Sequence, residues 1–373
     1  MKPTAAWEQR SVSLAAVFKR IVPRASVRIG LLAALLLALA PSGASAFSKA
    51  IWGDVYRNGV NQFPIYKQLG VSTYEAALSW NSVAPTGPRQ PTNPRDHAYQ
   101  WPIAIQQAVD QAKRFHMQVM LQIVGVPPWA NGRHPWNWVP YRPSDFGAFA
   151  TAAARRYPSV HLWMIWGEPN RAPNFQPLYP APSPFARLTP KQQIAPHNYA
   201  RLLDAAYGAL KGVSKQNVVI GGSTYTTGDI HTQQWIENLR LPNGRPPRMD
   251  VYAHNPFTNV DPSFNVPYST GGAVEFEDLH ELAGWTDQYL HRGLPLFLSE
   301  WTVPTCPDYE YNFFVDPPVA ARWVRDALRL SRAWKRINTL GWVHVYDDPG
   351  VSCGGLMTVT GKRKPTFDAF ARG

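Results

Sequence analysis

Residues 161–170 read HLWMIWGEPN, a run of aliphatic and aromatic residues that ends in a carboxylate, Glu168. Such a run, closed by glycine and proline, is typical of a buried β-strand. A second run, PLFLSEW at 295–301, has the same form and carries Glu300 near its end. If the two strands are parallel, Glu168 and Glu300 lie at the same edge of one sheet.

Short β-like runs of this kind alternate with helix-like segments along the chain. The eight runs are 50–56, 72–80, 118–124, 161–166, 218–223, 249–254, 296–299 and 340–346. Segments between them, such as 102–115, 144–157, 199–213 and 319–335, have apolar residues three and four positions apart. Because no Gly-rich phosphate loop follows the first run, the pattern predicts an α/β fold with a single (β/α)8 (TIM) barrel rather than an open sheet.

Residues 1–46 differ from the rest of the chain. Six basic residues and one acidic residue lie in 1–28, an apolar run of 12 residues follows at 29–40, and Ala44-Ser45-Ala46 suits signal peptidase. The run is shorter than the roughly 20 residues that span a bilayer. We expect a signal peptide at 1–46 and a secreted or extracytoplasmic domain at 47–373, without stable membrane insertion after cleavage; an uncleaved anchor at the cell envelope is the alternative.

The formal net charge is +12, but the basic residues are spread along the chain. Scattered charge is typical of a solvated surface, so we expect no nucleic-acid partner. The chain has no His-x-His, His-Glu-x-x-His or Cys-x-x-Cys motif. A metal site is therefore not expected, and the sequence predicts no cofactor.

The chain has two cysteines, Cys306 and Cys353, which follow the seventh and eighth predicted strands. Neighbouring strands bring these loops together at one end of a barrel, and an exported protein meets oxidising conditions. The sequence predicts a disulfide between them. Two free buried thiols are the alternative.

Strand ends are where a barrel of this kind builds its site, which makes Glu168 and Glu300 the first catalytic candidates. Cleavage of a glycosidic bond uses one carboxylic acid to protonate the leaving oxygen and one carboxylate to attack or to activate water. Two acids on opposite strands of one barrel suit that division of labour. The alternative for either acid is an ordinary surface or helix-capping glutamate.

The motifs Glu168-Pro169-Asn170 and Ser299-Glu300-Trp301 resemble the catalytic motifs of clan A retaining glycoside hydrolases, a group that includes cellulases and β-xylosidases. The resemblance continues in Val126–Ala130 and in Gly355–Met357, and it covers essentially all of 47–373. It implies that Glu168 is the acid/base and Glu300 the nucleophile in double-displacement hydrolysis of a β-linked glycoside or polysaccharide.

Two residues depart from the pattern of that clan. Gly167 stands where an asparagine usually contacts the sugar, and Glu75 stands where the second strand usually carries an arginine. The departures support a second hypothesis, a carbohydrate-binding barrel of the cell envelope that has weak activity or none.

The resemblance and the strand ends also suggest residues that bind the substrate, an oligosaccharide or polysaccharide. These are Trp80, Trp129, Asn170, His254, Asn255, Trp301 and Trp342. Core packing is the competing explanation for the tryptophans and for His254. A proline-rich insertion at 171–196 is expected to form a wall of the cleft rather than a plain linker. We expect the protein to be a monomer.

Overall fold

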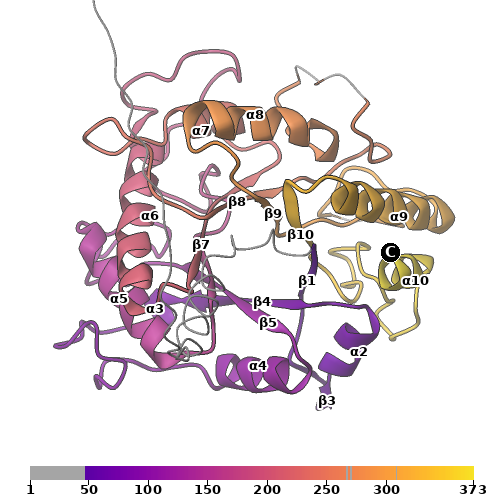
Figure 1. Cartoon of the computed structure of the whole chain (residues 1–373), viewed down its shortest axis with the longest axis horizontal. Coiled ribbons are helices and arrows are strands. Elements are labelled where there is room, and N and C mark those ends of the chain that lie inside the picture. The colour runs from indigo at the N-terminus through magenta and orange to yellow at the C-terminus, as the bar shows by residue number, and fades with distance from the viewer. Residues whose placement is uncertain (1–46, 266–267, 269–270, 308) are drawn as a thin grey trace, which may run out of the picture. The chain divides into compact units, whose positions relative to one another are not determined.

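The computed structural model describes residues 47–265, 268, 271–307 and 309–373, so the predicted signal peptide lies outside the described residues. Eight parallel strands form a closed barrel in chain order, and β10 pairs with β1 to close it (Figure 1). The predicted (β/α)8 barrel is confirmed. The strands are β1 (Ser48–Trp52), β4 (Thr73–Ser79), β5 (Gln118–Val124), β6 (Leu162–Ile165), β7 (Val218–Tyr225), β8 (Val251–Asn255), β9 (Leu296–Leu298) and β10 (Ile337–Trp342).

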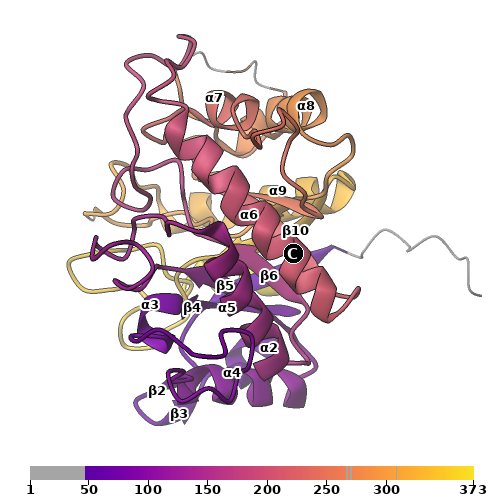
Figure 2. The ribbon, with the colours of Figure 1, turned by 90° about the vertical axis from the view of Figure 1, so that its left-hand side faces the viewer.

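Helices surround the barrel, and α5 and α6 lie side by side on one flank (Figure 2). They are α2 (Phe63–Gln68), α3 (Trp80–Val83), α4 (Ile103–Arg114), α5 (Pro143–Arg156), α6 (Ile194–Val213), α7 (Thr232–Glu237), α8 (Leu279–Tyr289), α9 (Pro317–Ala333) and α10 (Pro365–Arg372). A short hairpin, β2 (Tyr56–Arg57) with β3 (Val60–Asn61), and the 3-10 turn η2 (Phe276–Asp278) complete the described elements. No described helix is long and apolar enough to cross a membrane.

The last barrel strand begins and ends earlier than its sequence suggests. The apolar pattern predicts a strand at 340–346, whereas β10 runs from Ile337 to Trp342. The polar residues Asn338 and Thr339 interrupt the apolar pattern at the start of β10, so the pattern does not reveal where the strand begins. Residues 343–346 leave the sheet and contribute to the loops at the barrel mouth.

The barrel interior and the space between barrel and helices form two separate apolar clusters. The interior cluster holds Ala50, Met120, Met164, Ile220, Val251, Ala253 and Phe297, and a much larger cluster lies under the helices. Successive residues of a strand face opposite sides, so β1, β5, β6, β7, β8 and β9 contribute to both clusters. Polar side chains are buried in the same barrel, among them Glu75 of β4 and Gln122 of β5.

Gly341 occupies a point on β10 where a side chain does not fit. A Cβ atom at this position would lie 2.1 Å from the carbonyl oxygen of Ser299 and 2.7 Å from Oε1 of Glu75. Because both neighbours are fully enclosed, they have little freedom to move away.

We therefore predict that Gly341→Ala lowers the free energy of unfolding by about 1–3 kcal/mol, the usual cost of overpacking. Urea denaturation followed by tryptophan fluorescence measures it. Gly284→Ala in α8 is the matched control, because no atom lies within 4 Å of its Cβ; it should raise stability by about 0.5–1 kcal/mol. Equal stability of Gly341→Ala and the wild type would contradict the packing argument.

Candidate active site

Glu168 stands on a strained turn directly after β6. Trp166 and Glu168 have φ angles of 70° and 47°, in the left-handed region that non-glycine residues seldom adopt. The turn is held from both sides: the Trp166 indole donates to the carbonyl of Asn174 at 2.9 Å, and the Glu168 amide donates to the carbonyl of Ser223 at 2.8 Å. Strain that is maintained in this way at a strand end is typical of functional sites.

Three donors hold the carboxylate of Glu168. Arg171 Nη1 and Asn174 Nδ2 donate to Oε2 at 2.7 Å and 3.1 Å, and Asn255 Nδ2 donates to Oε1 at 3.0 Å. The glutamate side chain is only 12% exposed. Both oxygens are thus bonded in this structure, and the three donors fix the orientation of the carboxylate.

Glu300 lies two residues beyond the end of β9 and is partly exposed. Its carboxylate accepts no hydrogen bond from the residues that the structure describes. Burial, and then the negative charges of Glu168 and Glu310, raise its pKa to about 8, while the charge of Arg171 acts in the opposite direction. Glu168 and Glu300 therefore interact electrostatically at the mouth of the barrel.

A third carboxylate, Glu310, belongs to the loop between β9 and α9. Its Oε2 lies 2.7 Å from Nε2 of His344. Burial raises the pKa of Glu310, but hydrogen bonds from His344 and Ser352 outweigh burial and lower it. A disulfide between Cys306 and Cys353, with Cα atoms 5.6 Å apart, joins the loops that carry these groups.

Glu75 is the fourth carboxyl group of this end of the barrel. It is 1% exposed, and its Oε2 accepts a hydrogen bond from the hydroxyl of Ser299 at 2.6 Å. Burial, with the charge of Glu300, raises its pKa well above the ordinary value. We refer to these four groups as the carboxyl cluster: Glu75, Glu168, Glu300 and Glu310.

Gly167 leaves room for a neighbouring strand. A Cβ atom on Gly167 would lie 2.9 Å from Nε2 of Gln122, which is buried on β5. Nε2 also approaches Sδ of Met164 at 3.3 Å. The carboxamide of Gln122 therefore occupies the space that a side chain at position 167 would need.

Of the tryptophans predicted to bind substrate, three are packed in the core. Trp80 stacks on Phe149, and Trp301 and Trp342 meet edge to face with ring centres 5.5 Å apart. All three are at most 1% exposed and cannot reach a sugar in this structure. Trp129 is 37% exposed, and its indole donates to the carbonyl of Ala84 at 2.8 Å.

The polar residues predicted to bind substrate also divide into two groups. Asn255 points into the mouth and bonds Glu168, but its neighbour His254 faces the helices. His254 bonds Thr224 Oγ1 and the Val274 carbonyl, both at 2.8 Å, and burial lowers its pKa to about 4. The structure therefore corrects the expectation for His254, because adjacent residues of one strand face opposite sides.

Asn170 likewise has a structural role rather than a free side chain. It is fully buried, and its Oδ1 accepts the amide of Tyr225 at 2.9 Å. Its Nδ2 donates to the carbonyls of Tyr225 and Ile230, each at 3.3 Å. Asn170 thus fixes the end of β7 against the turn that carries Glu168.

The sequence did not point to Arg171, Asn174 or Tyr225 as site residues. The guanidinium of Arg171 lies 4.2 Å from the centre of the Tyr225 ring, while it also bonds Glu168. Arg171 and Asn174 open the proline-rich insertion, three and six residues after the glutamate. That spacing on a tight turn was the available signal, because it returns both side chains to Glu168.

A cavity of about 440 Å³ opens beside the carboxyl cluster, at the ends of β1 and β10. Its walls include Trp52, Asp54, Arg57, His344 and Tyr346. Trp52 also donates to the hydroxyl of Ser299, at 3.2 Å, and His344 pairs with Glu310. The cavity therefore shares two side chains with the surroundings of the cluster.

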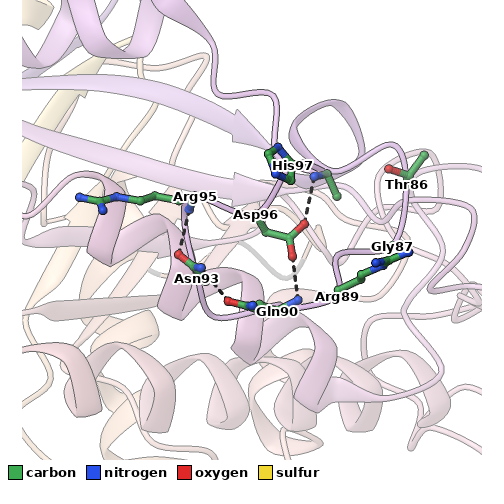
Figure 3. Close-up of a pocket in the computed structure, with 9 residues that line it drawn as sticks. Thr86, Gly87, Arg89, Gln90, Asn93, Arg95, Asp96 and His97 are labelled. Atoms are coloured by element: carbon green, nitrogen blue, oxygen red, sulfur yellow. Dashed lines mark hydrogen bonds between the residues drawn. The ribbon is translucent and has the colours of Figure 1, made fainter.

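A larger hollow of about 570 Å³ lies within the loop Thr86–Ala98. Figure 3 shows Asp96 in the middle of this loop, where its carboxylate accepts the amides of Gln90 and Ala98 at 2.7 Å and 3.0 Å. These bonds hold the loop in shape. None of the carboxyl cluster lines this hollow. Within the described residues, no group of three or more His, Cys, Asp or Glu side chains could hold a metal ion.

The disulfide gives a test of how firmly the loops are held. It closes a loop of 47 residues, so replacing both Cys306 and Cys353 by serine should lower the free energy of unfolding by about 3–4 kcal/mol. Chemical denaturation measures the difference. Dithiothreitol should lower the stability of the wild type to the same value and leave the double variant unchanged; a wild type indifferent to reductant would argue against the bridge.

Comparison with protein-family models finds no match, and no curated protein is detectably similar in sequence. The fold, however, is similar to solved glycosidases. A family 39 glycoside hydrolase from Bacteroides cellulosilyticus WH2 matches with a TM-score of 0.60 and 16% identity, over 88% of this chain and 63% of that one. A monomeric β-xylosidase from Caulobacter crescentus CB15 matches with 0.59 and 17%, over 87% and 67%.

An endo-1,4-β-xylanase from Penicillium canescens matches with a TM-score of 0.55 and 14% identity, over 87% of this chain and 92% of that one. The chain spans less than two thirds of the length of the Bacteroides enzyme. At these identities the likeness concerns the fold. The resemblance to clan A glycosidases is therefore confirmed as a shared architecture: the chain has the (β/α)8 barrel of these enzymes.

Proposed function

We propose that the chain is a retaining glycoside hydrolase that cleaves a β-linked glycoside or polysaccharide. The observation that carries the proposal is the pair of glutamates at the ends of β6 and β9, on a barrel whose structural neighbours are glycosidases. Export through residues 1–46 would place the activity outside the cytoplasm, and one copy of the chain would suffice for it. No metal or organic cofactor enters the reaction.

In the proposed first step, a carboxylate oxygen of Glu300 attacks the anomeric carbon while the bond to the leaving oxygen breaks. Glu168 donates its proton to that oxygen, and a covalent glycosyl ester of Glu300 remains. In the second step Glu168 removes a proton from water, which attacks the same carbon and frees Glu300. Two inversions return the original configuration.

The mechanism requires a particular protonation state of each glutamate, Glu168 and Glu300. The nucleophile must be ionised, yet the pKa of Glu300 is raised to about 8. Only a minor fraction of the free protein therefore has a charged Glu300 near neutral pH. Glu168, for its part, must carry a proton before it can act as an acid.

The first prediction of the proposed function concerns the two acids. Glu168→Gln and Glu300→Gln should each lower kcat by about 10²–10⁴-fold, the usual contribution of such a group. Release of chromophore from aryl β-glycosides and dye-linked polysaccharides measures the loss. Glu237→Gln, on the exposed side of α7, is the matched control and should retain activity.

Rescue by azide tests which acid is the nucleophile. With Glu300→Gly, azide should replace the carboxylate and give a glycosyl azide of inverted, α configuration. With Glu168→Ala, azide should instead attack the glycosyl ester of Glu300 and give the β product. The opposite result would exchange the two roles.

The second prediction concerns pH. The mechanism needs one proton in total on the pair Glu168 and Glu300. Because the pKa of Glu300 is raised to about 8, the pair loses that proton as the pH rises through this value, and kcat/KM should fall there. Glu310→Gln removes one of the charges that raise this pKa, so the fall should move to lower pH. Glu237→Gln should leave it in place. A fall centred near the ordinary glutamate value would contradict the electrostatic analysis.

One observation favours a second function, a carbohydrate-binding barrel without efficient turnover. In the free protein the raised pKa of Glu300 disfavours, near neutral pH, the ionised nucleophile that double displacement needs. Such a protein would bind oligosaccharides in calorimetry, release no product from any substrate, and bind equally well after Glu300→Gln. Measurable hydrolysis that this substitution abolishes would exclude it.

A further inference from the structure

Ser299, the residue before Glu300, is held by two other strands of the barrel. Trp52 on β1 and Glu75 on β4 are direct neighbours in the sheet register. The indole of Trp52 donates to Ser299 Oγ at 3.2 Å, and the Ser299 hydroxyl donates to Glu75 Oε2 at 2.6 Å. The segment that carries Glu300 is thus tied to strands β1 and β4.

The contact crosses a strand that lies between its partners. In the barrel β10 separates β9 from β1, and Gly341 of β10 lies where Ser299 and Glu75 meet. Any side chain at Gly341 would occupy that space. The combination of a glycine on β10 and a carboxyl group on β4 therefore makes the bond to Ser299 possible.

The surroundings of Glu75 suit a neutral carboxyl group. Its Oε1 is buried and has no hydrogen-bond partner among the described residues. The donors that act on the carboxyl group, the Ser299 hydroxyl at Oε2 and the Trp52 indole, are both uncharged. Among the described residues Glu300 is the group whose charge acts on Glu75, and that charge is negative as well. An ionised group with an unbonded, buried oxygen is costly, whereas a protonated one loses far less hydration.

We propose that Glu75 is a positioning residue for Glu300: as a neutral acid it anchors Ser299, and it leaves Glu300 as the carboxyl group of the two that ionises in the reaction. The proposal rests on the proposed function, in which Glu300 is the nucleophile. A positioned carboxylate approaches the anomeric carbon in one orientation, and small displacements of a reacting group are expensive in rate. Burial and the neighbouring charge, which raise the pKa of Glu75, agree with the neutral state.

The kinetic test compares an uncharged isostere with a truncation. Glu75→Gln keeps an oxygen that can accept the Ser299 hydroxyl, so kcat should stay within about threefold of the wild type and the pH profile should not move. Glu75→Ala removes the anchor, and kcat should fall by about 10- to 100-fold with little change in KM. Ser299→Ala should behave like Glu75→Ala. Equal losses for Glu75→Gln and Glu75→Ala, or a pH profile shifted by Glu75→Gln, would overturn the proposal.

A second measurement needs no activity. In the unfolded chain Glu75 releases its proton above its ordinary pKa of 4.5, while the folded protein keeps it. The wild type should therefore lose stability relative to Glu75→Gln as pH rises above that value. Glu300 and the buried Glu277, whose pKa burial raises to about 7, are present in both proteins and cancel.

Urea denaturation of both proteins between about pH 4 and pH 8 gives this difference, with Glu237→Gln as the control that should show none. A flat difference for Glu75→Gln would mean that Glu75 ionises normally, which overturns the proposal. If the slope is present but the wild type hydrolyses no glycoside, the protonation of Glu75 stands and the proposed function fails.

Discussion

Negative charge at the mouth of the barrel is the constraint on which the site depends. The carboxyl cluster gathers four acids in a space where burial penalises every one of them, and like charges in such a place cannot all be present. The negative charge of each acid is neutralised or avoided in a different way. Arg171 compensates Glu168, His344 compensates Glu310, and Glu75 keeps its proton, which leaves Glu300 without a partner among the described residues.

The fold makes this arrangement possible. Strand ends meet at one rim, so residues more than 200 positions apart, such as Glu75 and Ser299, come within hydrogen-bond distance. The same architecture makes it unfavourable to bury a charged group at this end of the barrel. Apolar side chains fill the barrel below the rim, and the polar side chains buried in the same barrel have little access to water. Charge there must be neutralised by neighbours rather than by solvent.

The sequence was sufficient to predict the barrel, the order of its strands, and the position of Glu168 and Glu300 at strand ends, because apolar runs and their spacing carry that information. It was insufficient for the direction of individual side chains. All five residues of β8 are buried, so composition could not show that Asn255 faces the mouth and His254 the helices. Likewise β10 ends at Trp342, so the strand predicted at 340–346 stops four residues earlier than expected.

The hydrogen-bond partners of the acids could also not be predicted from the sequence. Arg171 and Asn174 follow Glu168 closely, but only the left-handed turn at Trp166 and Glu168 brings them back to the carboxylate. The bond between Glu75 and Ser299 depends on three strands at once. Interactions that require the register of several strands leave no local pattern in the chain.

Gly341 has a consequence for how the protein can evolve. It has no side chain that could contact a substrate or form a hydrogen bond, yet it keeps open the space through which Ser299 and Glu75 meet. Selection that keeps the bond between Ser299 and Glu75 therefore also keeps a glycine at position 341. A larger residue there would meet the backbone oxygen of Ser299 as well as the carboxyl group of Glu75, so it would require both a shift of the chain after β9 and the loss of that carboxyl group.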